Sequence, residues 1–167
     1  VGNDANELFV GRVRELGQLG RALEAARAGS GSTVLVAGDA GIGKTRLAAE
    51  LATRAVDAGF EVLTGRSIDL IRVDLPYQPF VEALRPLGAL ARPDELAAGS
   101  QLVVFEQAIA LLTDRAATAP VLLVLEDLHW ADASTLDLVV FLAHNLDDKR
   151  IVQLVSYRAD EPSSAER

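Results

Sequence analysis

Short apolar runs alternate with segments of helical apolar spacing along most of the chain. Apolar runs predict buried strands at 33–37, 60–64, 121–125 and 151–156. Apolar residues three or four positions apart predict helices around 16–26, over 46–58, around 80–87, over 102–117 and over 134–145, with loops at 67–75 and 91–100. Strands that alternate with helices favour an α/β fold, here a three-layer α/β/α sandwich with a mainly parallel sheet. Ligands are expected at the carboxyl ends of its strands.

A glycine-rich segment, residues 38–45, lies between the first predicted strand and the second helix. It fits the pattern G-x-x-x-x-G-K-[ST] and is called the phosphate loop below. Its backbone N–H groups and the following helix start are suited to phosphate oxygens, while Lys44 would neutralise the β and γ phosphates and Thr45 would bind Mg²⁺. A chance glycine turn is the alternative, and the strand and helix on either side argue against it. The expected nucleotide contacts are Gly38, Asp39, Ala40, Gly41, Ile42, Gly43, Lys44, Thr45 and Arg46.

Two acids, Glu126 and Asp127, follow the most apolar strand. In a protein with a phosphate loop, one such carboxylate holds Mg²⁺ and the other orients or deprotonates the attacking water. The two residues do not reveal which acid does which, so both are candidate metal ligands with Thr45, and both are candidate catalytic groups with Lys44. The alternative is that acids simply end a buried strand where it meets solvent.

Three arginines are further candidates. Arg158 follows the last strand and either contacts the γ-phosphate or is solvated. Arg12 either belongs to a loop that covers the base or begins a helix. Arg66, after the second strand, is left ambiguous.

Three residues that closely follow the acidic pair, His129, Trp130 and Asp132, are expected to have structural roles, or in the case of His129 to support the site from behind its ligands. His129 has no Cys or His partner nearby in the sequence that would make a metal site, and His144 has no evident link to it. Trp130 is interpreted as a packing residue and Asp132 as a helix-entry acid, with Ser134 beginning a capping-box-like start to the next helix.

Composition limits the partners. The net charge is −8 with a pI of about 4.7 and no cluster of Lys or Arg, so this segment is not expected to bind nucleic acid directly. It has no cysteine, which excludes disulfides and cysteine-bound zinc. No apolar run reaches the roughly 20 residues of a membrane span, and ATP chemistry makes the cytoplasm the expected compartment. The chain begins at Val1 and lacks methionine, so we expect residues 1–167 to be a single P-loop NTPase domain from a larger multidomain protein.

Four motifs together resemble the AAA-like ATPase domain of STAND signal-transduction proteins, most closely the large ATP-binding LuxR-type regulators of actinobacteria. They are Phe9-Val10-Gly11-Arg12, Ala40-Gly41-Ile42-Gly43-Lys44-Thr45, Leu125-Glu126-Asp127-Leu128-His129-Trp130-Ala131-Asp132 and Ser156-Tyr157-Arg158. The resemblance implies a switch that exchanges ADP for ATP, with Mg²⁺, and then self-associates or exposes an effector domain. It places Arg12 on the adenine side and Arg158 at a sensor position.

The resemblance also implies parts that lie outside this sequence. They are a fifth core strand and a winged-helix lid beyond Arg158, and in LuxR-type members a DNA-binding helix-turn-helix. Many relatives have aspartate at both acidic positions, whereas Glu126 is one methylene longer. Without the lid we expect weak nucleotide binding and little hydrolysis, and one bare edge of the sheet.

The leading hypothesis is therefore a regulatory ATPase module. Two alternatives stay open at this point: a small-molecule phosphoryl-transfer enzyme, which needs a substrate cleft and often an arginine-rich lid, and a nucleotide-stabilised scaffold without turnover. Adenine preference follows mainly from the resemblance, together with the lack of a guanine-reading N-K-x-D pattern.

Overall fold

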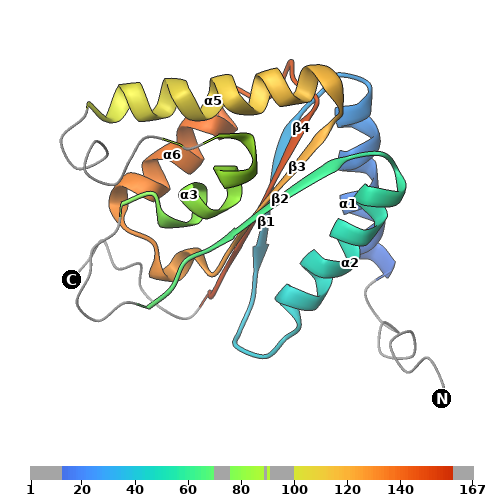
Figure 1. The fold of residues 1–167 in the computed structure, drawn as a ribbon. Coiled ribbons are helices and arrows are strands. Elements are labelled where there is room, and N and C mark those ends of the chain that lie inside the picture. The colour runs from blue at the N-terminus through green and yellow to red at the C-terminus, as the bar shows by residue number, and fades with distance from the viewer. Residues whose placement is uncertain (1–12, 70–75, 89, 91–99, 160–167) are drawn as a thin grey trace.

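The computed structural model describes residues 13–69, 76–88, 90 and 100–159 (Figure 1). The elements are α1 (Val13–Arg27), β1 (Ser32–Ala37), α2 (Lys44–Asp57), β2 (Glu61–Arg66), α3 (Gln78–Leu84), η1 (Arg85–Leu87), α5 (Gln101–Thr118), β3 (Val121–Glu126), η2 (Leu128–Trp130), α6 (Ala133–Ala143) and β4 (Ile151–Tyr157). None of the helices in these ranges is long and apolar enough to cross a membrane.

The four strands form one parallel sheet in the order β1-β4-β3-β2. Figure 1 shows α1 and α2 on one face of the sheet and α3, α5 and α6 on the other. This arrangement confirms the predicted three-layer α/β/α architecture. It also means that the carboxyl ends of β1, β4 and β3, which are neighbours, lie along one edge where their loops meet.

The central strand β3 is buried on both faces, as its continuous apolar run predicts. Leu123 and Leu125 pack into the core under α3, α5 and α6, whereas Leu122 and Val124 pack into the core under α1 and α2. The alternation follows from the two-residue period of a strand. Both cores therefore support the strand that ends in the acidic pair.

Strand β1 is confirmed, but its predicted burial is not. It lies at an edge of the described sheet and pairs only with β4, so Leu35 remains 60% exposed. An apolar run does not reveal whether a strand has one neighbour or two, because both positions use the same β-branched and aliphatic residues.

Among the boundaries that differ from the predicted ones, three lie close to the phosphate loop or the acidic pair. Helix α2 begins two residues earlier than expected, at Lys44, and β2 extends to Arg66 because its pairing with β3 runs as far as Arg66 beside Glu126. Helix α6 is capped by Asp132 and not by Ser134: the Asp132 carboxylate accepts a hydrogen bond from the Thr135 N–H at 3.2 Å. The expected role of Asp132 as a helix-entry acid is thereby confirmed.

Candidate nucleotide site

The phosphate loop connects β1 to the first turn of α2, and its backbone depends on glycine. Gly41 and Gly43 have φ angles of 79° and 89°, in the left-handed region that residues with a Cβ avoid. At Gly38, an added Cβ would lie 2.9 Å from the Ile42 side chain. The loop thus delivers the chain directly into the amino-terminal turn of α2, where N–H groups and the helix dipole favour an anion.

Lys44 is the first residue of α2 and is buried. Its ammonium donates hydrogen bonds to the Gly38 carbonyl at 2.5 Å and to the Asp39 carbonyl at 2.7 Å. These bonds use two of its three N–H donors and keep the ammonium group next to the backbone of the phosphate loop. The predicted phosphate-binding cation therefore sits inside the curve of the phosphate loop. Arg46 lies exposed one residue beyond Thr45.

Thr45 and Glu126 line one cavity of about 180 Å³ between α2 and the sheet. The remaining lining comes from small α2 residues and from Thr64 and Val124 on β2 and β3. Two of the three residues expected to share a metal ion, Thr45 on α2 and Glu126 at the end of β3, thus line the same cavity.

The Glu126 side chain is only 8% exposed. Its Oε2 accepts a hydrogen bond from the Arg66 Nη2 at 2.9 Å, while its Oε1 is buried without a hydrogen-bond partner among the described residues. A buried carboxylate oxygen is costly unless something donates to it or coordinates it. Hydroxyl and carboxylate oxygens are the donors that Mg²⁺ prefers, so Thr45 and Glu126 fit this ion.

The described residues contain no cluster of three or more His, Cys, Asp or Glu that would hold a metal ion unaided. This suits Mg²⁺, which is usually held by one or two protein carboxylates together with substrate phosphates and water.

Asp127 follows β3 with a φ of 59°, a left-handed conformation that Asp tolerates better than most residues. Its backbone N–H donates to the Ser156 Oγ at 3.3 Å, and its side chain is 31% exposed. The turn at Asp127 therefore separates the two acids: Glu126 is buried, and Asp127 is accessible to solvent.

Arg66 is the functional candidate that sequence reasoning left ambiguous. It pairs in register with Glu126, and its Nε also lies 3.6 Å from the Asp127 Oδ2. The hydrogen bond and charge of Glu126 raise the pKa of Arg66 above its ordinary value. Its place at the end of a strand was visible in the sequence, but the contact depends on β2 lying next to β3.

The remaining predicted residues fall into three groups. His129 is buried, and its ring packs on Trp130 with 4.9 Å between the ring centroids. His144 is exposed and donates its Nδ1–H to the Val140 carbonyl at 2.8 Å. Arg158 follows β4 and lines an apolar hollow of about 230 Å³ together with Leu35. Arg12 lies outside the described residues.

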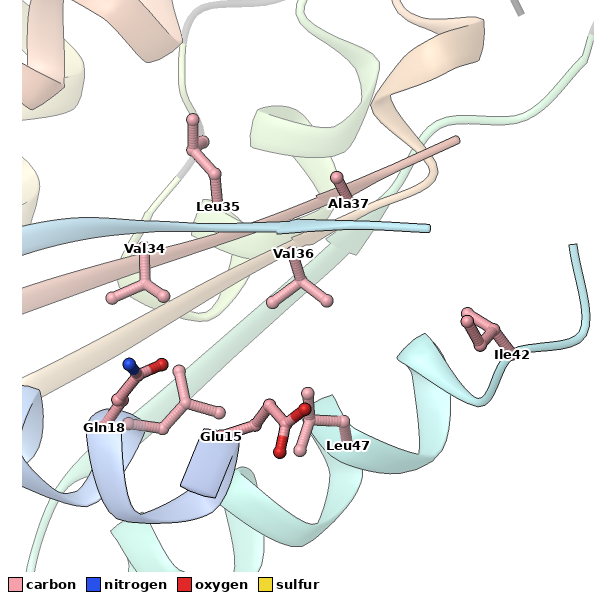
Figure 2. Close-up of a pocket in the computed structure, with 9 residues that line it drawn as sticks. Glu15, Gln18, Val34, Leu35, Val36, Ala37, Ile42 and Leu47 are labelled. Carbon is pink, nitrogen blue, oxygen red and sulfur yellow. The ribbon is translucent and has the colours of Figure 1, made fainter. Parts of the chain in front are cut away.

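A larger hollow, about 360 Å³, lies beside the edge of β1 near the phosphate loop. Figure 2 shows Val34 and Val36 pointing from β1 toward α1 and α2, with Leu35 and Ala37 on the opposite side of the strand. Ile42 enters this hollow from the phosphate loop, and Glu15 and Gln18 on α1 supply its polar groups.

A family model described as "AAA ATPase domain" matches residues 8–155. No curated protein matches the chain. A solved structure of Drosophila ORC bound to DNA aligns with a TM-score of 0.57 and 20% identity, over 90% of this chain and 39% of that one. A crystal structure of a DNA replication initiation factor gives a TM-score of 0.47 and 17% identity, over 92% of this chain and 41% of that one.

This chain spans about two fifths of the length of those two proteins. At 20% identity the likeness to Drosophila ORC concerns the fold, which agrees with the parallel sheet and its helical layers. The family model, by contrast, covers most of the sequence, including the phosphate loop and the acidic pair. The chain therefore belongs to the AAA ATPase domain family.

Proposed function

We propose that this chain is the ATP-binding, slowly hydrolysing switch module of a signal-transduction or transcription regulator. The family implies nucleotide binding and ATPase activity in general. The observation that carries the proposal for this chain is the cavity that Thr45 and Glu126 line together, beside the buried Lys44. A phosphate-binding lysine, a hydroxyl and a buried carboxylate at one site are what the chemistry of Mg²⁺-ATP requires.

The difference in burial assigns the two acids within this proposal. Glu126 lines the cavity with Thr45 and keeps a buried oxygen to offer, so it is the metal ligand. Asp127 is partly exposed and is held at a sharp turn, so it orients and deprotonates the attacking water. Mg²⁺, when bound, supplies positive charge to the phosphate oxygens. Lys44 stabilises the same oxygens from the phosphate loop.

The hollow beside Ile42 is the proposed position of the base. Most of the side chains that line it are apolar, and Glu15 and Gln18 offer acceptors for the exocyclic amine of adenine. Arg12 immediately precedes α1, the helix that carries both residues, and keeps its proposed place on the adenine side through the family resemblance.

The switching role rests on the resemblance to STAND proteins of the LuxR type. Arg158 follows β4, whose carboxyl end lies between those of β1 and β3, and it is proposed to sense the γ-phosphate. The partners proposed are other domains of the parent chain and, with ATP bound, further copies of the protein. With a net charge of −8, DNA binding would belong to a separate effector domain.

Nucleotide binding and single-turnover hydrolysis test this function. We expect Lys44→Ala to weaken ATP binding by at least about tenfold, since it removes a buried charge-assisted contact. Asp127→Asn should leave ATP affinity within about twofold and slow phosphate release about 100-fold, the usual contribution of a general base. Arg54→Ala, which removes an exposed arginine of α2 paired with Glu50, is the matched control for charge loss. Unchanged ATP affinity in Lys44→Ala would overturn the proposal.

The same measurements separate the alternatives. A scaffold without turnover would bind ATP, but neither the wild type nor Asp127→Asn would release phosphate. A phosphoryl-transfer enzyme would instead show ATP consumption that depends on an added small-molecule acceptor.

A further inference from the structure

The guanidinium of Arg66 lies across both members of the acidic pair. Its Nη2 is 2.9 Å from the Glu126 Oε2, and its Nε is 3.6 Å from the Asp127 Oδ2. One positive side chain therefore pairs with both of the carboxylates proposed to hold the metal and to activate water, and offsets one of their two negative charges. Arg66 engages only one oxygen of Glu126, while the other is buried without a hydrogen-bond partner among the described residues.

The backbone of Arg66 is fixed, whereas its side chain has freedom to move. The Arg66 N–H donates to the Glu82 Oε2 at 2.9 Å, and the preceding Gly65 packs so closely that an added Cβ would lie 1.8 Å from the Pro79 carbonyl oxygen. The Arg66 side chain is nevertheless 48% exposed. An arginine at this position can leave the acids for solvent without any shift of β2.

We propose that the Arg66 side chain competes with a divalent cation for the carboxylates of Glu126 and Asp127. Arg66 is thus a positioning residue, which pairs with both acids until the cation binds. A guanidinium and a divalent ion cannot share these carboxylates without strong repulsion at such distances. While Arg66 lies beside Asp127, its positive charge also makes that carboxylate a weaker base toward water. Arg66 therefore raises the cation concentration at which the site is completed and slows hydrolysis. The inference rests on the proposed role of the acidic pair and adds its regulation.

A matched arginine provides the comparison. Arg115 on α5 pairs with Glu61 at the opposite end of β2, and its side chain is also 48% exposed. It joins a helix to the same strand but lies away from the site. If the Arg66 contact merely stabilised the fold, loss of either arginine would have the same kind of effect.

The test is a titration of the nucleotide-free protein with Mn²⁺. The electron paramagnetic resonance signal of the free ion monitors how much Mn²⁺ is bound. We expect Arg66→Ala to bind Mn²⁺ about fivefold more tightly than the wild type, the low end of couplings between linked sites, because the arginine is half exposed. Arg66→Lys keeps the charge without the planar fork and should fall between the two. Arg115→Ala should bind as the wild type does. The fluorescence of Trp130, the only tryptophan and three residues from Asp127, gives a second readout of the same binding.

The sign of the change decides the outcome. Unchanged or weaker Mn²⁺ binding in both Arg66 variants would overturn the inference, since a structural role predicts weaker binding and competition predicts tighter binding. Glu126→Gln distinguishes this failure from failure of the proposed function. If Glu126→Gln abolishes Mn²⁺ binding but neither Arg66 variant tightens it, only the role of Arg66 is wrong. If Glu126→Gln leaves Mn²⁺ binding unchanged, the metal role of the acid itself is wrong.

Discussion

Ser156 at the end of β4 accepts a hydrogen bond from the Asp127 backbone N–H at 3.3 Å. Ser156 is buried, and Asp127 has a left-handed backbone conformation that must be held in place by its surroundings. The neighbouring strand thereby fixes the turn that separates the two acids. This contact links the geometry of the candidate catalytic group to the order of strands in the sheet.

Ser156→Ala is expected to lower the free energy of unfolding by about 1 kcal/mol, the cost of leaving one N–H without its acceptor. It should also slow single-turnover hydrolysis more than it weakens ATP binding, because the turn at Asp127 loosens while the phosphate loop is untouched. Urea unfolding and phosphate release measure the two effects. Ser32→Ala is the control: the Ser32 hydroxyl is buried without a hydrogen-bond partner among the described residues, so its loss should cost little. Equal destabilisation by both changes would contradict this account.

Gly65→Ala is expected to destabilise the protein by more than about 2 kcal/mol, toward the upper end of overpacking costs. The new methyl group would lie 1.8 Å from the Pro79 carbonyl oxygen, a backbone atom that cannot rotate away. Gly20→Ala in α1 is the opposite case, because nothing lies within 4 Å of its added Cβ. That change should stabilise the protein by about 0.5 kcal/mol through helix propensity. Thermal unfolding of the two variants should therefore move in opposite directions.

Asp132→Ala is expected to cost about 1 kcal/mol by removing the amino-terminal cap of α6. The Asp132 carboxylate contacts both the N–H and the Oγ1 of Thr135, and that Oγ1 in turn accepts from the Tyr77 N–H at 3.0 Å. Asp132→Asn preserves an acceptor and should recover most of the loss. Urea unfolding measures both. Single-turnover hydrolysis should change far less than in Asp127→Asn, and a comparable loss of rate would contradict a purely capping role.

Much of the fold was predictable because local patterns and global structure agree. The run 121–125 is apolar on both faces and forms most of β3, an inner strand of the sheet, and the phosphate loop lies between strand and helix as its motif requires. Helix α1 likewise buries Leu16, Leu19 and Leu23, the residues whose spacing predicted it. For these elements the spacing of the apolar residues was sufficient to predict the secondary structure.

The parts that sequence reasoning missed depend on the order of strands. The exposure of Leu35 follows from β1 lying at the edge of the described sheet, and the contacts of Arg66 follow from β2 lying beside β3. Neither neighbour is specified by the residues of the strand itself. The assignment of Glu126 as the buried acid similarly needed the turn at Asp127, since adjacent acids look equivalent in a sequence.

The ionisation of Tyr77 makes the free energy of unfolding depend on pH in the alkaline range. Burial raises the pKa of its phenol above the ordinary value of 10.0, and a hydrogen bond with Ser134 offsets only part of this shift. The folded state keeps the proton that the unfolded state loses, so this contribution to stability is complete below pH 10 and is lost as the pH rises through the folded-state pKa. We expect Tyr77→Phe to lose less stability than the wild type between pH 8 and about pH 11, measured by urea unfolding. Tyr157→Phe, which changes the only other tyrosine, is the control, and an equal loss in both variants would show that Tyr77 is not responsible.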